Sequence, residues 1–74
     1  MQKKVPMFYD PDTDRWCVGQ DGDSYGLHCG ECFEIYLGES AIPCRIEMDR
    51  DWYLIINGVS FNLRKSNRYL VNMK

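Results

Sequence analysis

The segment IPCRIEMDRDWYLIINGVSFNL, residues 42–63, decides the fold class because apolar side chains recur in it at every second position. The alternation runs through Ile42, Cys44, Ile46 and Met48, and later through Val59, Phe61 and Leu63. A period of two residues is typical of half-buried β-strands. Asn57 and Gly58 both tolerate positive φ angles, and they stand between the runs LII and VSF. They therefore predict a tight hairpin turn.

The same rhythm extends to both sides of this segment. Further strands are expected at residues 33–37, 52–56 and 69–73, and an N-terminal hairpin is expected from VPMFY (5–9) and RWCV (15–18). The stretch GQDGDSYG, residues 19–26, holds three glycines and two aspartates and is interpreted as the longest loop. A single helical turn is compatible with residues 63–67.

Seven short strands joined by tight turns predict an all-β fold, namely a small SH3-like barrel of short antiparallel strands with an N-terminal hairpin. A chain of 74 residues leaves room for one domain, residues 1–74. Within it, residues 1–18 would form the hairpin and residues 27–74 the barrel. The side chains expected to fill the core are those of Phe33, Ile35, Ile46 and Leu54.

The charge balance disfavours generic nucleic-acid binding. The chain has 9 Lys and Arg against 11 Asp and Glu, a net charge of −2, whereas proteins that grip phosphates usually show a basic excess. The charges are unevenly spread along the chain. Asp10, Asp12, Asp14, Asp21 and Asp23 lie near the N-terminus, and Arg64, Lys65, Arg68 and Lys74 lie near the C-terminus. Such an asymmetry can orient a partner.

No segment approaches the about 18 apolar residues of a membrane-spanning helix, so no membrane partner is expected. The opening MQKKVPMFYD has no long apolar stretch after its two lysines, which argues against a signal peptide. These features predict a cytoplasmic protein, in which thiols are normally reduced.

The cysteines raise the question of a metal. Cys29 and Cys32 have the C-x-x-C spacing of a zinc knuckle, but a structural zinc site needs four ligands, and the remaining thiols, Cys17 and Cys44, are isolated in the sequence. The favoured interpretation is a tight turn at Gly30 flanked by buried or half-buried thiols. The sequence therefore predicts no cofactor, with a zinc-stabilised module as the alternative.

Aromatic side chains and arginine are the usual anchors of a binding surface. The candidates for such a surface are Tyr36, Arg45, Trp52, Tyr53 and Tyr69. For Trp52 the simpler interpretation is core packing, because small barrels fill their cores with large rings. Tyr36 alternates away from its apolar neighbours and so faces outward. Arg45 shares a strand face with Glu47, and an exposed ion pair is the simpler interpretation there.

The motifs LHCG (27–30), FE (33–34), RIE (45–47) and DWYL (51–54) together resemble a family of small bacterial domains of unknown function. The resemblance implies a small β-barrel and a setting in Gram-positive bacteria, their phages and their mobile elements. It brings no catalytic residues with it. The strand rhythm is also similar to that of SH3 and Tudor-like modules, a likeness that many small barrels share.

These observations predict a non-enzymatic module that binds an unidentified protein partner, and the resemblance suggests an accessory or anti-defence protein of a phage or mobile element. One alternative is a small barrel that binds nucleic acid or a nucleotide, which would require basic side chains to converge beside Tyr69. Those side chains are Arg45, Arg50, Arg64, Lys65 and Arg68. The other alternative is the zinc module at Cys29 and Cys32. No nucleophile, base and orienting group stand at credible spacing, so an enzyme is not expected.

Overall fold

The computed structural model describes residues 2–20 and 22–73. Met1, Asp21 and Lys74 lie outside the described residues, and so do the charges of Asp21 and Lys74 that form part of the predicted charge asymmetry. The strands are β1 (Gln2–Asp10), β2 (Arg15–Gln20), β3 (Asp23–Gly26), β4 (Cys32–Leu37), β5 (Ser40–Met48), β6 (Trp52–Ile56), β7 (Val59–Asn62) and β8 (Tyr69–Met73). The described residues contain no helix, and thus none long and apolar enough to cross a membrane. The prediction of an all-β fold of short antiparallel strands with an N-terminal hairpin is confirmed.

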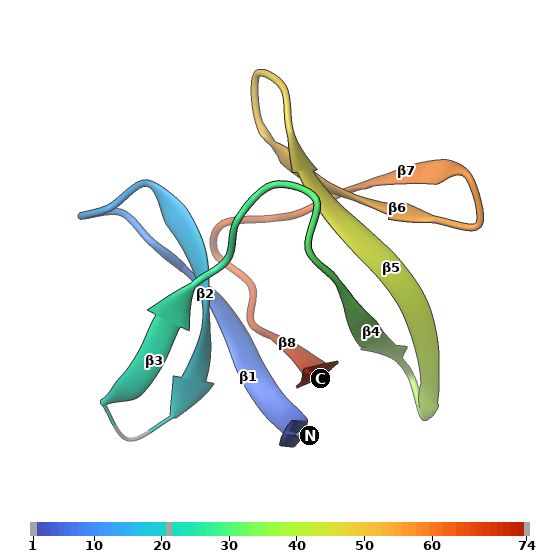
Figure 1. Ribbon diagram of the computed structural model, residues 1–74, viewed down its shortest axis with the longest axis horizontal. Helices are drawn as coiled ribbons and strands as arrows, with labels where there is room; N and C mark the ends of the chain where they lie inside the picture. Colours follow the sequence, from blue (N-terminus) through green and yellow to red (C-terminus); the bar gives the residue numbers. More distant parts are fainter. Residues whose placement is uncertain (1, 21, 74) are drawn as a thin grey trace.

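All eight strands belong to one sheet in the order β3-β2-β1-β8-β4-β5-β6-β7, and every neighbouring pair is antiparallel. Figure 1 shows β1, β2 and β3 on the left, β4 to β7 on the right, and β8 between them. The last strand of the chain therefore joins the two halves, since β8 pairs with both β1 and β4. The sheet curls around a barrel-like core.

Side chains from both halves fill this core. The four residues predicted to lie there, Phe33, Ile35, Ile46 and Leu54, are all buried, with exposed fractions of 2% or less. The N-terminal half contributes fully buried side chains as well, among them Met7, Trp16 and Val18. Because the apolar faces of both halves meet here, burial of these side chains is the main force that closes the sheet.

One buried polar side chain fixes the position of β8 in the sheet. The side-chain oxygen of Asn72 accepts a hydrogen bond from the backbone N–H of Lys4 at 2.9 Å, and its Nδ2 donates to Glu34 Oε1 at 2.9 Å. Lys4 has a φ of +52° and lies where the register of β1 against β8 shifts. Asn72 thus satisfies its own polar groups while it links the irregularity in β1 to β4.

The hairpin predicted at Asn57 and Gly58 is confirmed. Both residues have positive φ, +51° and +77°, and they join Ile56 directly to its pairing partner Val59. Two consecutive positive φ angles are the signature of the turn whose twist matches that of the flanking strands.

Two expectations about irregular segments are wrong. Residues 19–26 do not form a long loop, because β3 pairs there with β2, with Gly19 opposite Ser24. A Cβ atom at Gly19 would lie 2.3 Å from the Asp23 carbonyl oxygen, so glycine allows this close approach. Residues 63–67 form no helical turn either. They contain a single turn in which the Asn67 N–H donates to the Arg64 carbonyl at 3.0 Å.

Candidate functional site

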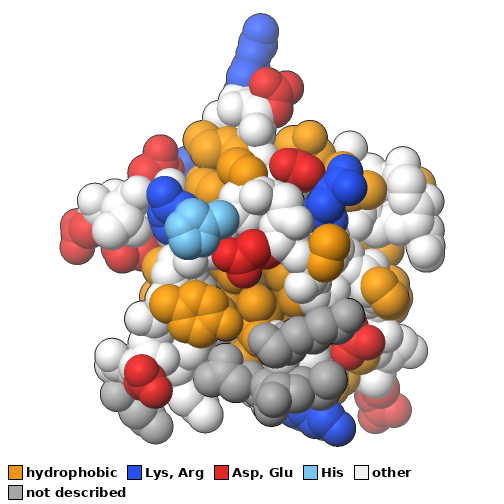
Figure 2. Space-filling model, viewed as in Figure 1, with side chains coloured by type: hydrophobic (Ala, Val, Ile, Leu, Met, Phe, Trp, Pro, Cys, Tyr) orange, Lys and Arg blue, Asp and Glu red, His pale blue; other side chains and the backbone are white. Residues whose placement is uncertain are grey.

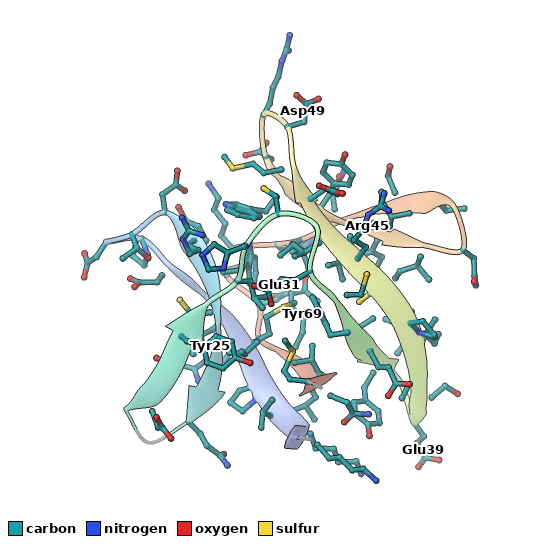
Figure 3. The ribbon with its side chains drawn as sticks, in the orientation of Figure 1. Tyr25, Glu31, Glu39, Arg45, Asp49 and Tyr69 are labelled. Atoms are coloured by element: carbon teal, nitrogen blue, oxygen red, sulfur yellow. The ribbon has the colours of Figure 1, made fainter. Side chains whose placement is uncertain are left out.

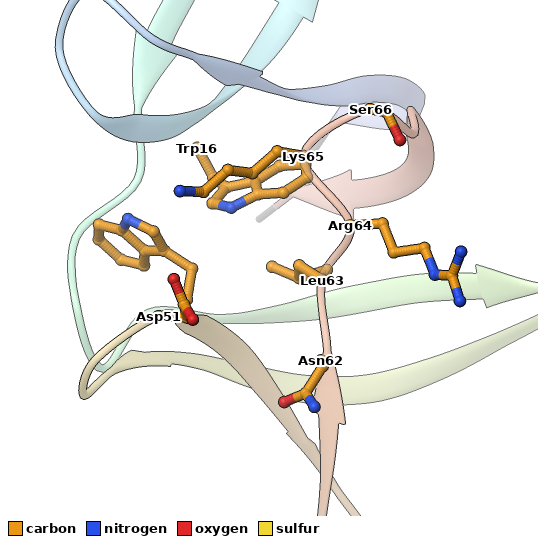
Figure 4. A pocket seen from close by; sticks show the side chains of 8 residues that line it. Trp16, Asp51, Asn62, Leu63, Arg64, Lys65 and Ser66 are labelled. Atoms are coloured by element: carbon orange, nitrogen blue, oxygen red, sulfur yellow. The ribbon is translucent and has the colours of Figure 1, made fainter.

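A cleft of about 670 Å³ opens beside the connection from β7 to β8. We call it the tryptophan cleft. It is lined by Trp16, Asp51, Trp52, Asn62, Leu63, Arg64, Lys65 and Ser66. Figure 4 shows that the lining side chains come from separate parts of the chain: the first hairpin, the region around Asp51, and the segment from Asn62 to Ser66. The cleft exists only because the curl of the sheet brings these parts together.

Trp16 forms the inner wall of the cleft. Its side chain is fully buried and packs against Tyr9 and Tyr69, with ring centroids 5.8 Å away in each case. Its indole nitrogen, Nε1, has no hydrogen-bond partner among the described residues. Figure 4 shows this nitrogen on the edge of the ring turned toward Leu63. A buried donor without an acceptor is unfavourable by ~1–3 kcal/mol, so such groups are rare and call for an explanation.

Trp52 lies on the other side of the cleft and has a satisfied indole. Its side chain is 5% exposed, and its Nε1 donates to the backbone carbonyl of Asp14 at 3.3 Å. This bond crosses from the start of β6 to the turn between β1 and β2. Trp52 is therefore mainly a core residue, as expected from the sequence. It also presents part of its surface to the cleft.

Charges of both signs surround the tryptophan cleft. Arg64 and Lys65 contribute cationic groups and Asp51 an anionic one. Lys65 Nζ lies 4.8 Å from the centre of the Tyr9 ring, within the range of a cation–π interaction. The Arg64 backbone N–H donates to the hydroxyl oxygen of Tyr69 at 3.0 Å. Both cationic residues are thus held in place by tyrosines that also pack on Trp16.

The acidic turn between β1 and β2 borders this region. The hydroxyl group of Tyr9 donates a hydrogen bond to a carboxylate oxygen of Asp14. That hydrogen bond, followed by partial burial and the negative charges of Asp14, Asp10 and Asp51, raises the pKa of Tyr9 to about 12. Tyr9 is therefore a neutral donor at physiological pH, and the flank of the cleft is acidic while its rim at Arg64 and Lys65 is basic.

The structure brings only two of the five predicted binding residues to this cleft. Trp52 lines it, and Tyr69 supports it from behind through Trp16 and Arg64. Figure 3 shows Tyr69 near the middle of the molecule and Arg45 on β5, and Arg45 is not among the residues that line the tryptophan cleft. Arg45 Nε pairs with Glu47 Oε2 at 2.8 Å, the simple ion pair that the shared strand face indicated. Tyr36 lies under Lys4, whose Nζ is 5.5 Å from the ring centre.

The fifth candidate, Tyr53, lines a second cleft on the outer face of the β6–β7 hairpin. We call this the tyrosine cleft; its volume is about 360 Å³. It is lined by Asp49, Arg50, Asp51, Tyr53, Ser60 and Asn62. Asp51 and Asn62 line both clefts, so the two clefts adjoin near the end of β7.

Sequence reasoning missed Trp16 and Leu63 as site residues, and it considered Lys65 only for the nucleic-acid alternative. The available signal was weak: Trp16 is one of only two tryptophans, and Lys65 lies in a short run of basic residues. Nothing in the sequence indicates that Trp16 would meet a segment almost fifty positions later. That neighbourhood depends on the order of strands in the sheet.

The basic residues of the nucleic-acid alternative are divided between separate places. Arg64, Lys65 and Arg68 share the connection that precedes Tyr69, where Arg68 stacks over Phe8 with 5.4 Å between guanidinium carbon and ring centre. Arg45 is paired on β5, and Arg50 belongs to the tyrosine cleft. Figure 2 shows charged side chains of both signs interspersed with apolar ones on the displayed face, without a large basic patch.

The four cysteines do not gather. Cys29 and Cys32 are exposed, whereas Cys17 and Cys44 are buried, so the expectation of buried or half-buried thiols beside Gly30 is wrong. Burial is the main cause that raises the pKa of Cys44, to about 12, and it also raises the pKa of Cys17. Zinc binds the thiolate, which these two buried residues therefore resist forming. Within residues 2–20 and 22–73, no group of three or more His, Cys, Asp and Glu side chains is placed to hold a metal ion.

Comparisons with known proteins identify similarity over most of the chain. Residues 5–73 match the family model described as domain of unknown function DUF5348. A crystal structure of a protein from Ruminococcus gnavus is similar over 96% of this chain and 100% of that chain, with 38% sequence identity and a TM-score of 0.75. No curated protein matches the chain. The similarity therefore extends over both halves of the sheet.

Proposed function

The chain belongs to the DUF5348 family of domains of unknown function, and from its site geometry we propose that it is a non-enzymatic module that binds a partner protein in the tryptophan cleft. The observation that carries this proposal is the buried Nε1 of Trp16, a donor without an acceptor among the described residues, on a side chain that borders an open cleft. Because this nitrogen is fully buried, an acceptor group on a partner would satisfy it only when the side chains that cover it move aside on binding.

The chemistry around this donor suits a protein ligand. The Trp52 and Leu63 side chains offer apolar surface, Arg64 and Lys65 attract a carboxylate or carbonyl oxygen, and the acidic flank repels a second negative group. Tryptophan, tyrosine and arginine dominate the binding energy of protein interfaces, because they combine a large apolar area with a polar group. The ligand that fits best is a segment that presents an acceptor or acidic side chain beside an apolar one.

The proposal includes no catalysis and no cofactor. His28, the only histidine, is paired with Glu31 at 3.1 Å, and its side chain is 76% exposed and absent from the cleft lining. Stoichiometric zinc in the purified protein, with loss of the fold in the presence of a chelator, would contradict the cofactor part of the proposal.

We extend the proposal to the biological setting. The resemblance noted in the sequence supports an accessory or anti-defence role for a phage or mobile element of a Gram-positive bacterium, acting in the cytoplasm. It also supports the view that the protein uses its curled sheet as SH3-like modules do, as a rigid platform for a partner segment.

The proposal is tested with a displayed library of short random peptides, selected on the immobilised protein. We expect wild type to enrich peptides that share an acidic and an apolar position. Trp16→Phe should bind the selected peptides about tenfold more weakly, since it removes the N–H and keeps a ring. The double variant Tyr36→Ala/Arg45→Ala is the matched control away from the cleft, and it should bind as wild type does.

If selection enriches no peptide family, or if the double variant loses binding while Trp16→Phe keeps it, the tryptophan cleft is not the partner site. Circular dichroism spectra of all three proteins establish that any loss of binding is not a loss of fold.

A nucleic-acid ligand is our second candidate, because Arg64, Lys65 and Arg68 lie on one connection next to the ring of Tyr69. Backbone phosphates would release counterions on binding, so affinity for single-stranded oligonucleotides should fall steeply as salt rises. Weak binding that does not change with salt concentration would reject this candidate.

A further inference from the structure

The free edge of β7 offers backbone hydrogen-bonding groups next to the tryptophan cleft. β7 ends the sheet and pairs with β6 alone. The two-residue turn makes Ile56 and Val59 a hydrogen-bonded pair, and the alternation along an antiparallel ladder then turns the N–H and C=O groups of Ser60 and Asn62 away from β6. Within the described residues, no backbone bond from a turn or loop reaches these outward groups. They form the template that an added strand needs.

Both faces of such an added strand would meet a cleft. Ser60 and Asn62 share the outer face with Tyr53, where the tyrosine cleft lies. Phe61 pairs with the buried Leu54 and so faces the core side, and Leu63 follows it at the wall of the tryptophan cleft. Since side chains alternate along a strand, successive residues of the added strand would point toward one cleft and then toward the other.

The β7 edge also lacks the charged residues and prolines that usually hinder strand addition. Its sequence, VSFN, has no charged residue and no proline, and Val59 is 66% exposed. Edge strands are commonly protected by charges, prolines or bulges. The opposite edge of the sheet, β3, begins with the charged Asp23.

We propose that an extended segment of a partner protein adds to the edge of β7 as an antiparallel strand, with an acidic residue upstream in that segment lying beside Arg64 and Lys65. In an antiparallel pair, the N-terminal part of the added strand lies beside the C-terminal end of β7. Arg64 and Lys65 follow that end, so the upstream residues of the added strand lie next to these two cations. This inference rests on the proposed partner binding and adds how the partner is held.

Charge complementarity favours a partner segment over a second copy of this chain. If two copies of β7 paired with each other so that Ser60 of one lay opposite Asn62 of the other, Arg64 and Lys65 of one copy would lie beside Gly58 and Asn57 of the other. That turn has no carboxylate to pair with the cations. A different chain that supplies an acidic residue meets the charge requirement.

The test uses the peptides selected on the wild-type protein, resynthesised with single N-methylated backbone amides. Methylation removes one donor and blocks close approach of another strand. We expect alternate positions of the peptide to lose affinity by about tenfold or more, and the positions between them to lose little, since only every second amide faces β7.

The protein side of the test is Ser60→Pro. An outward-facing N–H on an edge strand is a position where proline is tolerated, so the fold should persist while peptide affinity falls by about tenfold or more. Ser24→Pro is the matched control, because Ser24 lies one residue beyond the pair Gln20–Asp23 on the β3 edge, as Ser60 lies one residue beyond the pair Ile56–Val59. It should bind the peptides as wild type does.

The outcomes separate this inference from the proposed function. If Trp16→Phe weakens binding but Ser60→Pro and the alternate N-methyl peptides do not, the cleft binds a partner and the added strand is wrong. An equal loss from Ser24→Pro would also overturn the inference. So would light scattering that shows a wild-type dimer and a Ser60→Pro monomer, since the occupant of the edge would then be a second copy. If Ser60→Pro fails to fold, the N-methyl series decides alone.

Discussion

The first hairpin and the β6–β7 region each contribute one tryptophan to the same cleft, and the two indoles differ in how their N–H groups are satisfied. Trp52 donates to the carbonyl of Asp14 and so links the two regions. Trp16 is buried at least as completely, but its N–H has no acceptor within the described residues. Burial alone therefore does not distinguish the two rings from each other. The hydrogen-bond inventory of each ring does.

The largest loss of folding stability is expected when the ring of Trp16, whose N–H has no acceptor among the described residues, is removed. Trp16→Ala deletes the side chain that packs between Tyr9 and Tyr69. The loss in free energy of unfolding should be ~3–5 kcal/mol, as for other fully buried aromatic residues, which is a large part of the stability of a small domain. Urea unfolding measures it, with half-buried Tyr36→Ala as the reference. If the two variants lost equal stability, Trp16 would not be the central packing residue of its region.

The two tryptophans are compared most directly when each is replaced by phenylalanine. Trp52→Phe and Trp16→Phe remove similar volumes, but only the first breaks a hydrogen bond, the one to Asp14. Trp52→Phe should therefore cost ~1 kcal/mol more free energy of unfolding than Trp16→Phe. Thermal unfolding of the two variants side by side checks this. Equal losses would mean that the Trp16 N–H is satisfied in solution, for example by a bound water.

A smaller loss of stability is expected when the pH is raised, because of Tyr9. This residue packs on Trp16 and donates a hydrogen bond to the side chain of Asp14. The hydrogen bond to Asp14 is the first cause that raises the pKa of Tyr9 to about 12 from its ordinary value of 10.0. A raised folded-state pKa contributes stability that is fully present below pH 10 and is lost as pH rises toward 12.

The melting temperature of wild type should therefore fall more between about pH 9 and pH 12 than that of Tyr9→Phe. Cys17 and Cys44, whose pKa values are also raised, are present in both proteins and cancel in the difference. Parallel pH profiles would show that the link between Tyr9 and Asp14 does not hold the two regions together.

The smallest change in folding stability is expected for a substitution at Arg45, which lies away from both tryptophans. Arg45 and Glu47 form an ion pair whose side chains are 49% and 27% exposed. Arg45→Ala should change the free energy of unfolding by no more than ~0.5 kcal/mol and leave peptide binding unchanged. A larger change, read from the same urea curves, would indicate that the β5 face takes part in coupling the two regions.

The sequence predicts the fold better where apolar residues alternate than where the backbone alone makes the structure. The strands around Ile35, Ile46 and Leu54 and the turn at Asn57-Gly58 follow directly from side-chain pattern and φ preferences. β3 escaped prediction because its residues are largely exposed and polar, and its pairing with β2 depends on backbone bonds and on the close approach at Gly19.

The site was less predictable than the fold. Trp52 and Tyr69 were expected at a binding surface, but Tyr36, Arg45 and Tyr53 lie elsewhere, because period-two reasoning gives a residue's face and not its neighbours across the sheet. The pairing of β8 with β1 brings Tyr69 next to the first hairpin. No local pattern reports such a pairing between residues far apart in the chain.

The central place of β8 has a consequence for how the chain matures on the ribosome. Gln2 pairs with Met73, and Val5 with Val71, so the contacts that unite the two halves are among the most distant in the chain. A nascent polypeptide could form its local hairpins early, yet could not complete its core until residues 69–73 had emerged from the exit tunnel. Topologies dominated by distant contacts fold slowly, so closure of the core during synthesis depends on the emergence of residues 69–73.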